Sequence, residues 1–336
     1  MKKLTGSKSL SLLILALFMV MLTACGGEDA GGSTEGDGDG GEGVKSVKMV
    51  LNWFPKSQHG GIYAAAEKGI FEENGLDVTL EPGGPQVSAI QIVSSGSAEF
   101  GLVHADQMVI AKNQGIDLVA VATAMQGSPQ AFVFHEGAGI EDFEDLNGRD
   151  VYIQPGITYW EFLKSKYDLS GVNEMAYNGQ YANFMNDKDA VSQSFLTSEP
   201  FMLENQGIAN ETMLISDSGY DPYNVVLFVT KKYLEENEET VQKMVTAFVD
   251  GWNEYKNSSE EINEVIHELN PDLSLESLQF ETETQAEFIY EGDAAEHGVG
   301  YMSEERWTTL KDQLLDLGLL EEDFDANEIF TTKFIK

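Results

Sequence analysis

Cysteine is almost absent from this sequence, because Cys25 is the one cysteine in 336 residues. That scarcity excludes a disulfide framework, and it excludes zinc or iron–sulfur centres held by several cysteines. Bases are scarce too, with 20 Lys and Arg against 57 Asp and Glu. Because phosphates are bound through Lys and Arg, a net charge of −37 excludes nucleic-acid binding through a basic patch. Arg149 and Arg306 are the only arginines, which leaves little for bidentate recognition of anions.

The remaining composition is that of a folded protein. Hydrophobic residues make up 42% of the chain and aromatic residues 10%, which is enough for a buried core. The length suggests about two domains.

The amino terminus has the features of an export signal. Lys2, Lys3 and Lys8 precede an apolar run from Leu10 to Leu22, which is short for a membrane span but typical of a secretory signal. The run ends in Leu-Thr-Ala-Cys at residues 22–25, which resembles the lipobox of bacterial lipoproteins. That resemblance implies lipidation of Cys25. We therefore predict an exported protein that is lipid-anchored to the outer face of a bacterial cell membrane.

Residues 26–43 are rich in glycine and acids and contain no base, which predicts a flexible spacer. After residue 45, short apolar runs alternate with amphipathic stretches, many of which end in glycine. Examples are the stretches that end at Gly75, Gly96 and Gly115, where glycine favours a left-handed helix stop. This alternation predicts an α/β protein with mostly parallel sheets that are covered on both faces.

Two extended apolar stretches, 130–136 and 224–231, look like crossings between lobes. A chain that leaves one α/β lobe and later returns makes two lobes with a cleft between them, where small ligands bind. The predicted division is a signal peptide at 1–24, a lipidated cysteine and spacer at 25–45, one lobe from 46–132 and 227–336, and another from 133–226.

A group of motifs near the start of the mature chain resembles the solute-binding proteins of ABC importers. The resemblance is strongest to the binders of thiamine pyrimidine precursors, and the nitrate, sulfonate and taurine binders share its later part. Further agreement extends over most of residues 46–255, including Glu-Phe-Gly at 99–101 and Ser-Glu-Pro at 198–200. The motifs that carry it are Leu-Asn-Trp-Phe-Pro at 51–55, His59, Tyr-Ala-Ala-Ala-Glu-Lys-Gly-Ile-Phe at 63–71, and Asn-Gly-Leu-Asp-Val at 74–78.

The resemblance implies a two-lobed fold of the periplasmic-binding-protein type II class, with the ligand in the cleft. It also implies that the partners are a small-molecule ligand and an ABC permease with its ATPase. We expect a monomer that contacts the membrane only through its lipid anchor, with no cofactor, no metal and no nucleic acid. The first candidate ligand is a thiamine pyrimidine precursor. A riboflavin-like molecule and an alkanesulfonate, taurine or nitrate remain alternatives.

Candidate ligand-binding residues lie at expected strand ends and helix starts. Aromatic rings would stack on a planar heteroaromatic ligand, and an acid such as Glu199 would accept from an amine. His59 matches a ligand-contacting histidine of the resembling family. Residues 83–86 offer a glycine loop that enters a helix. The full predicted set is Trp53, Phe54, His59, Tyr63, Gly84, His104, Asp106, Tyr159, Trp160, Tyr181, Glu199 and Tyr223.

Enzyme motifs are missing from the sequence, which has no Gly-x-Ser-x-Gly elbow and no His-Glu-x-x-His. The fungal relatives that synthesise the thiamine pyrimidine carry an iron-binding cysteine cluster, and this chain has none. We therefore expect a binding protein, and we keep a pyrimidine-synthase-like enzyme as the alternative.

Overall fold

The structure, a computed structural model, describes residues 43–335. The predicted signal peptide, Cys25 and nearly all of the spacer lie outside these residues. Glu42–Lys336 forms one compact unit. Within the described part, no helix has the length and apolar character needed to cross a bilayer.

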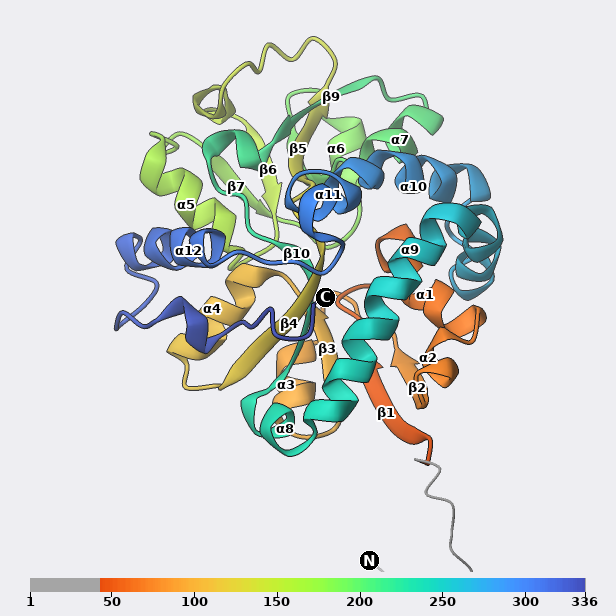
Figure 1. Ribbon diagram of the computed structural model, residues 1–336. Helices are drawn as coiled ribbons and strands as arrows, with labels where there is room; N and C mark the ends of the chain where they lie inside the picture. The colour runs from red at the N-terminus through yellow and green to blue at the C-terminus, as the bar shows by residue number, and fades with distance from the viewer. Residues whose placement is uncertain (1–42, 336) are drawn as a thin grey trace, which may run out of the picture. The chain divides into compact units, whose positions relative to one another are not determined.

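Two five-stranded sheets form the framework of this unit (Figure 1). In the first sheet the strand order is β2-β1-β3-β10-β4, and β10 runs antiparallel to both of its neighbours. Strands β3, β4 and β10 are buried almost throughout, which explains their continuous apolar sequence. The bounds are β1 (Lys45–Val50), β2 (Leu76–Glu81), β3 (Phe100–Val103), β4 (Leu118–Met125) and β10 (Asn224–Thr230).

The second sheet repeats this plan in the order β7-β6-β8-β5-β9. Here β5 is the antiparallel strand, and it lies between β8 and β9. Each sheet is thus mostly parallel, as predicted, with one reversed strand. The bounds are β5 (Gln130–His135), β6 (Asp150–Ile153), β7 (Asn173–Ala176), β8 (Val191–Phe195) and β9 (Asn210–Leu214).

The chain crosses between the sheets just before each stretch predicted as a crossing. All of β5 pairs within the second sheet, and all of β10 pairs within the first. The connecting segments are residues 126–129 and 219–223. The stretches at 130–136 and 224–231 were apolar because they are central strands, so the prediction that they are crossings was wrong by a few residues.

Helices cover both faces of the first sheet. Val47 and Met49 of β1 face the core beneath α1 and α9, while Val50 faces the core beneath α3 and α4. Helix α12 packs beside α4. The helices around this sheet are α1 (Gly60–Glu67), α2 (Ile70–Glu73), α3 (Ala89–Ser94), α4 (Ala105–Asn113), α8 (Lys231–Glu236), α9 (Glu238–Leu269) and α12 (Glu304–Asp316).

Shorter helices surround the second sheet, and α10 links the two halves. Helix α10 (Leu275–Tyr290) packs against α9 and also against α7 (Glu199–Asn205) (Figure 1). The remaining helices are α5 (Thr158–Lys166), α6 (Ala182–Asn186), α11 (Asp293–His297), and the 3-10 turns η1 (Ser57–His59), η2 (Phe143–Leu146), η3 (Ile215–Ser218) and η4 (Ala326–Glu328).

A close helix crossing fixes the start of α1. A Cβ atom added at Gly251 of α9 would lie 2.2 Å from the carbonyl oxygen of Gly61, so only glycine fits there. On the other side of the contact, a Cβ at Gly61 would lie 2.4 Å from the ring of Trp252. Because α1 begins directly after His59, this crossing also holds the loop that carries Trp53.

Candidate functional site

A cavity of about 580 Å³ lies where the two sheets face each other. Several lining residues follow parallel strands within three positions. They are Asn52 and Trp53 after β1, His104 after β3, Gln154 after β6, and Tyr177 after β7. Ligands of α/β proteins bind at the carboxyl ends of parallel strands, because loops from several strands converge there. The cavity therefore lies where the fold class predicts a binding site.

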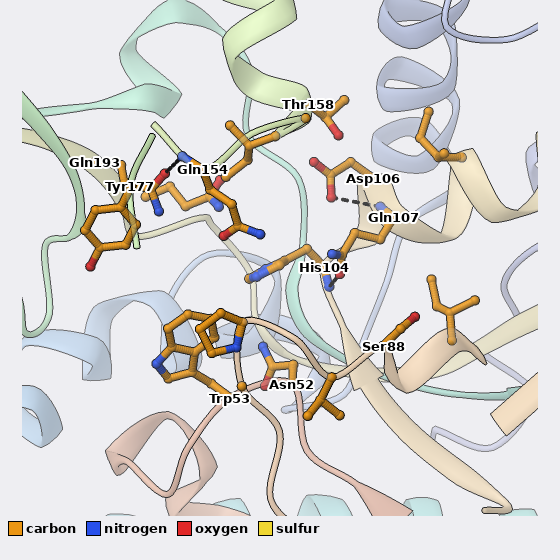
Figure 2. A pocket seen from close by; sticks show the side chains of 18 of the residues that line it. Asn52, Trp53, Ser88, His104, Asp106, Gln107, Gln154, Thr158, Tyr177 and Gln193 are labelled. Atoms are coloured by element: carbon orange, nitrogen blue, oxygen red, sulfur yellow. Dashed lines mark hydrogen bonds between the residues drawn. The ribbon is translucent and has the colours of Figure 1, made fainter. Parts of the chain in front are cut away.

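The walls come from both halves of the compact unit. Figure 2 shows Trp53 and Asn52 on one side, Gln154, Gln193 and Tyr177 across from them, and His104 between. Part of the lining comes from α3, α4 and the segments next to them, which contribute apolar as well as polar side chains. The apolar residues of this part include Val87, Ile90, Ile110, Ala111, Ile116 and Leu319.

Of the predicted residues, Trp53, Gly84, His104, Asp106 and Glu199 lie in the cavity lining. Whether they touch a ligand stays a prediction. The other seven predicted residues lie elsewhere, and their places follow from how their elements pack.

Phe54 and His59 flank the cavity. The Phe54 side chain is 49% exposed and meets the Trp53 ring edge-on, with ring centroids 5.7 Å apart. His59 is fully buried behind the wall, and its Nε2 lies 2.8 Å from Asn52 Oδ1. Gln58 Nε2 also lies 3.3 Å from His59 Nε2. Because Asn52 Oδ1 only accepts and its contact is the shorter one, we assign the proton to His59 Nε2, and Gln58 Nε2 then donates to Asn52 Oδ1 at 3.4 Å. Burial, aided by the nearby Lys56 charge, lowers the pKa of His59 to about 3, so the ring is neutral.

Tyr159 and Trp160 point into the core of the second half. Both are buried, and each ring meets the Phe132 ring edge-on with centroids 6.1 Å apart. The loop before α5 does reach the cavity through Gln154. The aromatic face of that helix covers the sheet instead, as expected for an amphipathic helix.

Three predicted tyrosines also lie outside the lining. Tyr63 is buried in α1, and Tyr181 is buried with its hydroxyl donating to the Gln193 carbonyl at 2.7 Å. Tyr223 is buried beneath the guanidinium of Arg306, which lies 4.0 Å from its ring centroid. In each case the ring packs in the core near the site. Strand and helix periodicity alone does not distinguish such a core residue from one that lines the cavity.

Lys56 is a lining residue that the sequence reasoning missed. Its Nζ lies 3.1 Å from Glu199 Oε1 and 3.9 Å from Glu281 Oε1, and it donates to Ser198 Oγ at 3.0 Å. Glu199 Oε2 in turn accepts from the Phe195 N–H at 2.7 Å. The cluster joins the loop after β1 to α7 and α10.

The electrostatics of this cluster follow from burial and pairing. Burial alone would lower the pKa of Lys56, but Glu199 and Glu281 raise it above its ordinary value. Burial would raise the pKa of Glu199, yet Lys56 and the Phe195 N–H hold it below its ordinary value. For Glu281 burial prevails, and its pKa is raised despite Lys56. One cation is thus shared by two buried carboxylates.

On the wall formed by α4, the carboxylate of Asp106 is already occupied. It accepts from the Gln107 N–H at 2.8 Å and from the Tyr220 hydroxyl at 3.0 Å. Burial lowers the pKa of His104, so this ring is neutral as well.

On the opposite wall lie Gln193 and Tyr177, which were also missed. Burial and the nearby Glu199 charge raise the pKa of Tyr177 to about 12, so its hydroxyl keeps its proton. Tyr177 follows β7 directly, and the strand-end rule that pointed to Trp53 would have found it.

No group of three or more His, Cys, Asp or Glu within residues 43–335 is placed to hold a metal ion. The cavity offers instead the aromatic rings of Trp53, Tyr177 and Phe195, several neutral amides, and a lysine whose charge is paired with carboxylates. Such a lining can bind a planar polar molecule through stacking and directional hydrogen bonds.

The chain is similar in sequence or structure to several known binding proteins. The chain is 24% identical to the riboflavin-binding protein RibY of Chloroflexus aurantiacus over 306 residues, covering 87% of this chain and 86% of that one. It is 24% identical to the formylaminopyrimidine-binding protein of Halalkalibacterium halodurans, covering 73% and 74%. The sulphonate-binding protein SsuA of Escherichia coli has a similar structure, with a TM-score of 0.66, 12% identity, and coverage of 84% and 91%.

The structural similarity confirms the predicted α/β fold of periplasmic binding proteins. Residues 56–262 match the family described as NMT1/THI5 like. This match spans more than half of the sequence, and the chain therefore belongs to the NMT1/THI5-like family.

Proposed function

We propose that this chain is the solute-binding component of an ABC importer and that it binds a small, uncharged heteroaromatic molecule in the cavity between its two sheets. The observation that carries the proposal is the lining, in which the Trp53 ring lies beside neutral amides at the ends of parallel strands. An indole face stacks on a planar ring, and amides fix the orientation of its polar edge.

The charge of the lining argues against an anionic ligand. Its charged side chains are Lys56, Asp106, Glu161 and Glu199, which are one cation and three carboxylates. The cation is held by Glu199 and by Glu281, so no free positive charge faces the cavity. An alkanesulfonate or nitrate ion would meet net negative charge without a compensating base.

The size of the cavity favours a ligand of more than one ring. Its volume of about 580 Å³ lies within the range of about 300–1,000 Å³ that holds drug-sized ligands. A single substituted pyrimidine would fill only part of this volume. A riboflavin-like molecule is therefore the first candidate, in agreement with the relative that binds riboflavin. A thiamine pyrimidine precursor is the second.

In the proposed mechanism, the half that contains the first sheet and the half that contains the second close on the ligand about the segments at 126–129 and 219–223. The closed form would then dock on the permease. Export through a signal at 1–24 and a lipid on Cys25 complete the proposal, because a tether would keep the binding unit near the importer.

A thermal-shift screen tests the proposal. The purified chain should melt at a higher temperature with riboflavin or with a related heteroaromatic solute, and Trp53→Ala should abolish that shift. The matched control is Phe54→Ala, which removes the exposed neighbour of Trp53 and should keep the shift. A response only to taurine, nitrate or alkanesulfonates would overturn the ligand class. Conversion of the solute into a new product would favour the synthase alternative.

A further inference from the structure

The orientation of an amide side chain decides whether it offers a donor or an acceptor to a ligand. Asn and Gln carry a carbonyl oxygen at one position and an NH₂ group at the other. When a donor of the protein binds the oxygen, the NH₂ group remains for the ligand. Three amides in the cavity lining, Asn52, Gln107 and Gln193, are fixed in this way.

Asn52 is fixed by two donors behind the wall. Its Oδ1 accepts from His59 Nε2 at 2.8 Å and from Gln58 Nε2 at 3.4 Å. The pKa of His59 is lowered to about 3 by burial, so the neutral ring keeps one proton, and the 2.8 Å contact places that proton on Nε2. Both lone pairs of Oδ1 are therefore used, and Nδ2 is the end of Asn52 that is left for the cavity.

Gln107 and Gln193 are held by backbone donors. Gln107 Oε1 accepts from the His104 N–H at 3.2 Å, and Gln193 Oε1 accepts from the Gln154 N–H. In Figure 2 Gln107 lies beside His104, while Gln193 lies on the opposite wall. The three fixed NH₂ groups thus come from the loop after β1, from α4 and from β8.

Two carboxylates of the lining are already occupied by donors of the protein. Asp106 accepts from Gln107 and Tyr220, while Glu199 accepts from Lys56 and Phe195. Gln58 is the one reversed amide, because its Nε2 donates to Asn52 and leaves Oε1. Fixed donors thus outnumber fixed acceptors in the part of the cavity that these contacts define.

We infer that the cavity selects an uncharged ligand whose ring projects hydrogen-bond acceptors, such as carbonyl oxygens, and that Asn52, Gln107 and Gln193 set this preference. His59 is a positioning residue, since it acts through Asn52. This inference rests on the proposed function and specifies the chemistry of the ligand.

A matched pair of bicyclic probes tests the preference. Pteridine-2,4-dione and pteridine-2,4-diamine share one skeleton. The dione projects two carbonyl oxygens on either side of a ring N–H, whereas the diamine projects two NH₂ groups on either side of an unprotonated ring nitrogen. Titration calorimetry at a pH where both are uncharged should show the dione bound at least about tenfold more tightly, since each mismatched group leaves a donor facing a donor. Equal affinity, or tighter binding of the diamine, would overturn the inference.

Isosteric variants locate the preference. Asn52→Asp and Gln193→Glu keep the fixed oxygen and replace NH₂ by an acceptor. Each should lower the dione-to-diamine affinity ratio by about tenfold or more. Gln206→Glu, which makes the same charge change at an exposed position outside the cavity, should leave the ratio unchanged. An unchanged ratio in both lining variants would remove these residues from the inference.

The role of His59 must be tested by a quantity that a loss of packing alone would not change, namely the dione-to-diamine affinity ratio. His59→Leu removes the donor to Asn52 Oδ1 and lets the amide turn over, so the affinity ratio should fall toward one. His59→Gln places an amide N–H in its stead and should restore the ratio. If both variants weaken the two probes by the same factor, His59 has only a structural role.

The two proposals fail differently. If neither pteridine, riboflavin nor any other heteroaromatic solute binds, the proposed function fails. If such solutes bind but the diamine is preferred, the function stands and the inference about the acceptor edge fails. Tight binding of ethanesulfonate, an acceptor-rich anion, would overturn the requirement that the ligand be uncharged.

Discussion

Replacing Lys56 by methionine should destabilise the protein strongly and in a pH-dependent way. Methionine keeps most of the side-chain length but removes the ammonium group that Glu199 and Glu281 share. The Lys56 side chain is 14% exposed, while those of Glu199 and Glu281 are 17% and 4% exposed. The variant therefore leaves two buried carboxylates without their cation.

Two estimates of the cost agree. Removal of one partner from a buried ion pair costs about 3–5 kcal/mol. Alternatively, a carboxyl escapes the burial of its charge by taking up a proton, which costs about 1.4 kcal/mol for each pH unit above its ordinary pKa near 4.3. That cost is about 5 kcal/mol at about pH 8 and about 1 kcal/mol at about pH 5. We therefore expect a loss of about 3–5 kcal/mol at the higher pH and about 1–2 kcal/mol at the lower pH.

The direction in which the destabilisation changes with pH follows from proton linkage. Without Lys56 the folded-state pKa values of both carboxyls rise above their unfolded values. A group with a raised folded pKa stabilises the fold at low pH, and this contribution is lost as the pH rises through that pKa. In the unchanged protein, Glu199 has a lowered pKa and Glu281 a raised one, so their pH dependences oppose each other.

Urea denaturation followed by circular dichroism at the two pH values measures the effect. The control is Lys188→Met, which removes an exposed lysine and should change the free energy of unfolding by less than about 0.5 kcal/mol. A Lys56→Met variant as stable as the control, or equally destabilised at both pH values, would refute the reasoning.

Three further results are expected. Gly251→Ala should reduce the free energy of unfolding, measured by urea denaturation, by about 1–3 kcal/mol, because the new Cβ would collide with Gly61. If the variant instead shows the small increase in stability that alanine usually gives in a helix, the close packing described here is contradicted. Affinity for the ligand, measured by calorimetry, should stay flat from about pH 5 to about pH 8, because the pKa of His59 is about 3; a transition near pH 6.5 would contradict the neutral, buried ring. The rings of Phe201 in α7 and Phe280 in α10 stack with their centroids 4.6 Å apart. Phe201→Ala removes this contact between the two halves, so the ligand-free variant should have a larger radius of gyration in X-ray scattering. An unchanged radius would show that this contact does not hold α7 to α10.

Local signals predicted much of the fold. The stretches that end at Gly75, Gly96 and Gly115 do so because these glycines adopt φ of 72°, 76° and 77°. Such left-handed stops depend on one residue type and are readable from sequence. The two crossings between the sheets were predicted a few residues too far along the chain, because a central buried strand and an apolar linker have the same composition.

The site was predictable where it follows strand ends. Trp53 and His104 come directly after β1 and β3, so topology alone brings them to one edge. The cluster of Lys56 with Glu199 and Glu281 was not predictable, because it depends on α10 folding back over the loop after β1. Tyr159 and Trp160 were predicted to face the ligand because they follow a strand end and open a helix, whereas in the structure both rings pack inward against Phe132.

The central claim is that an uncharged heteroaromatic solute binds between the two sheets. A crystal structure of the chain, grown with the heteroaromatic solute that raises its melting temperature most, tests this directly. The account predicts a planar ligand against the Trp53 ring, with acceptor atoms within hydrogen-bond distance of Asn52 Nδ2 and Gln193 Nε2. A ligand bound elsewhere on the protein, or an anion in the cavity paired with Lys56, would contradict it.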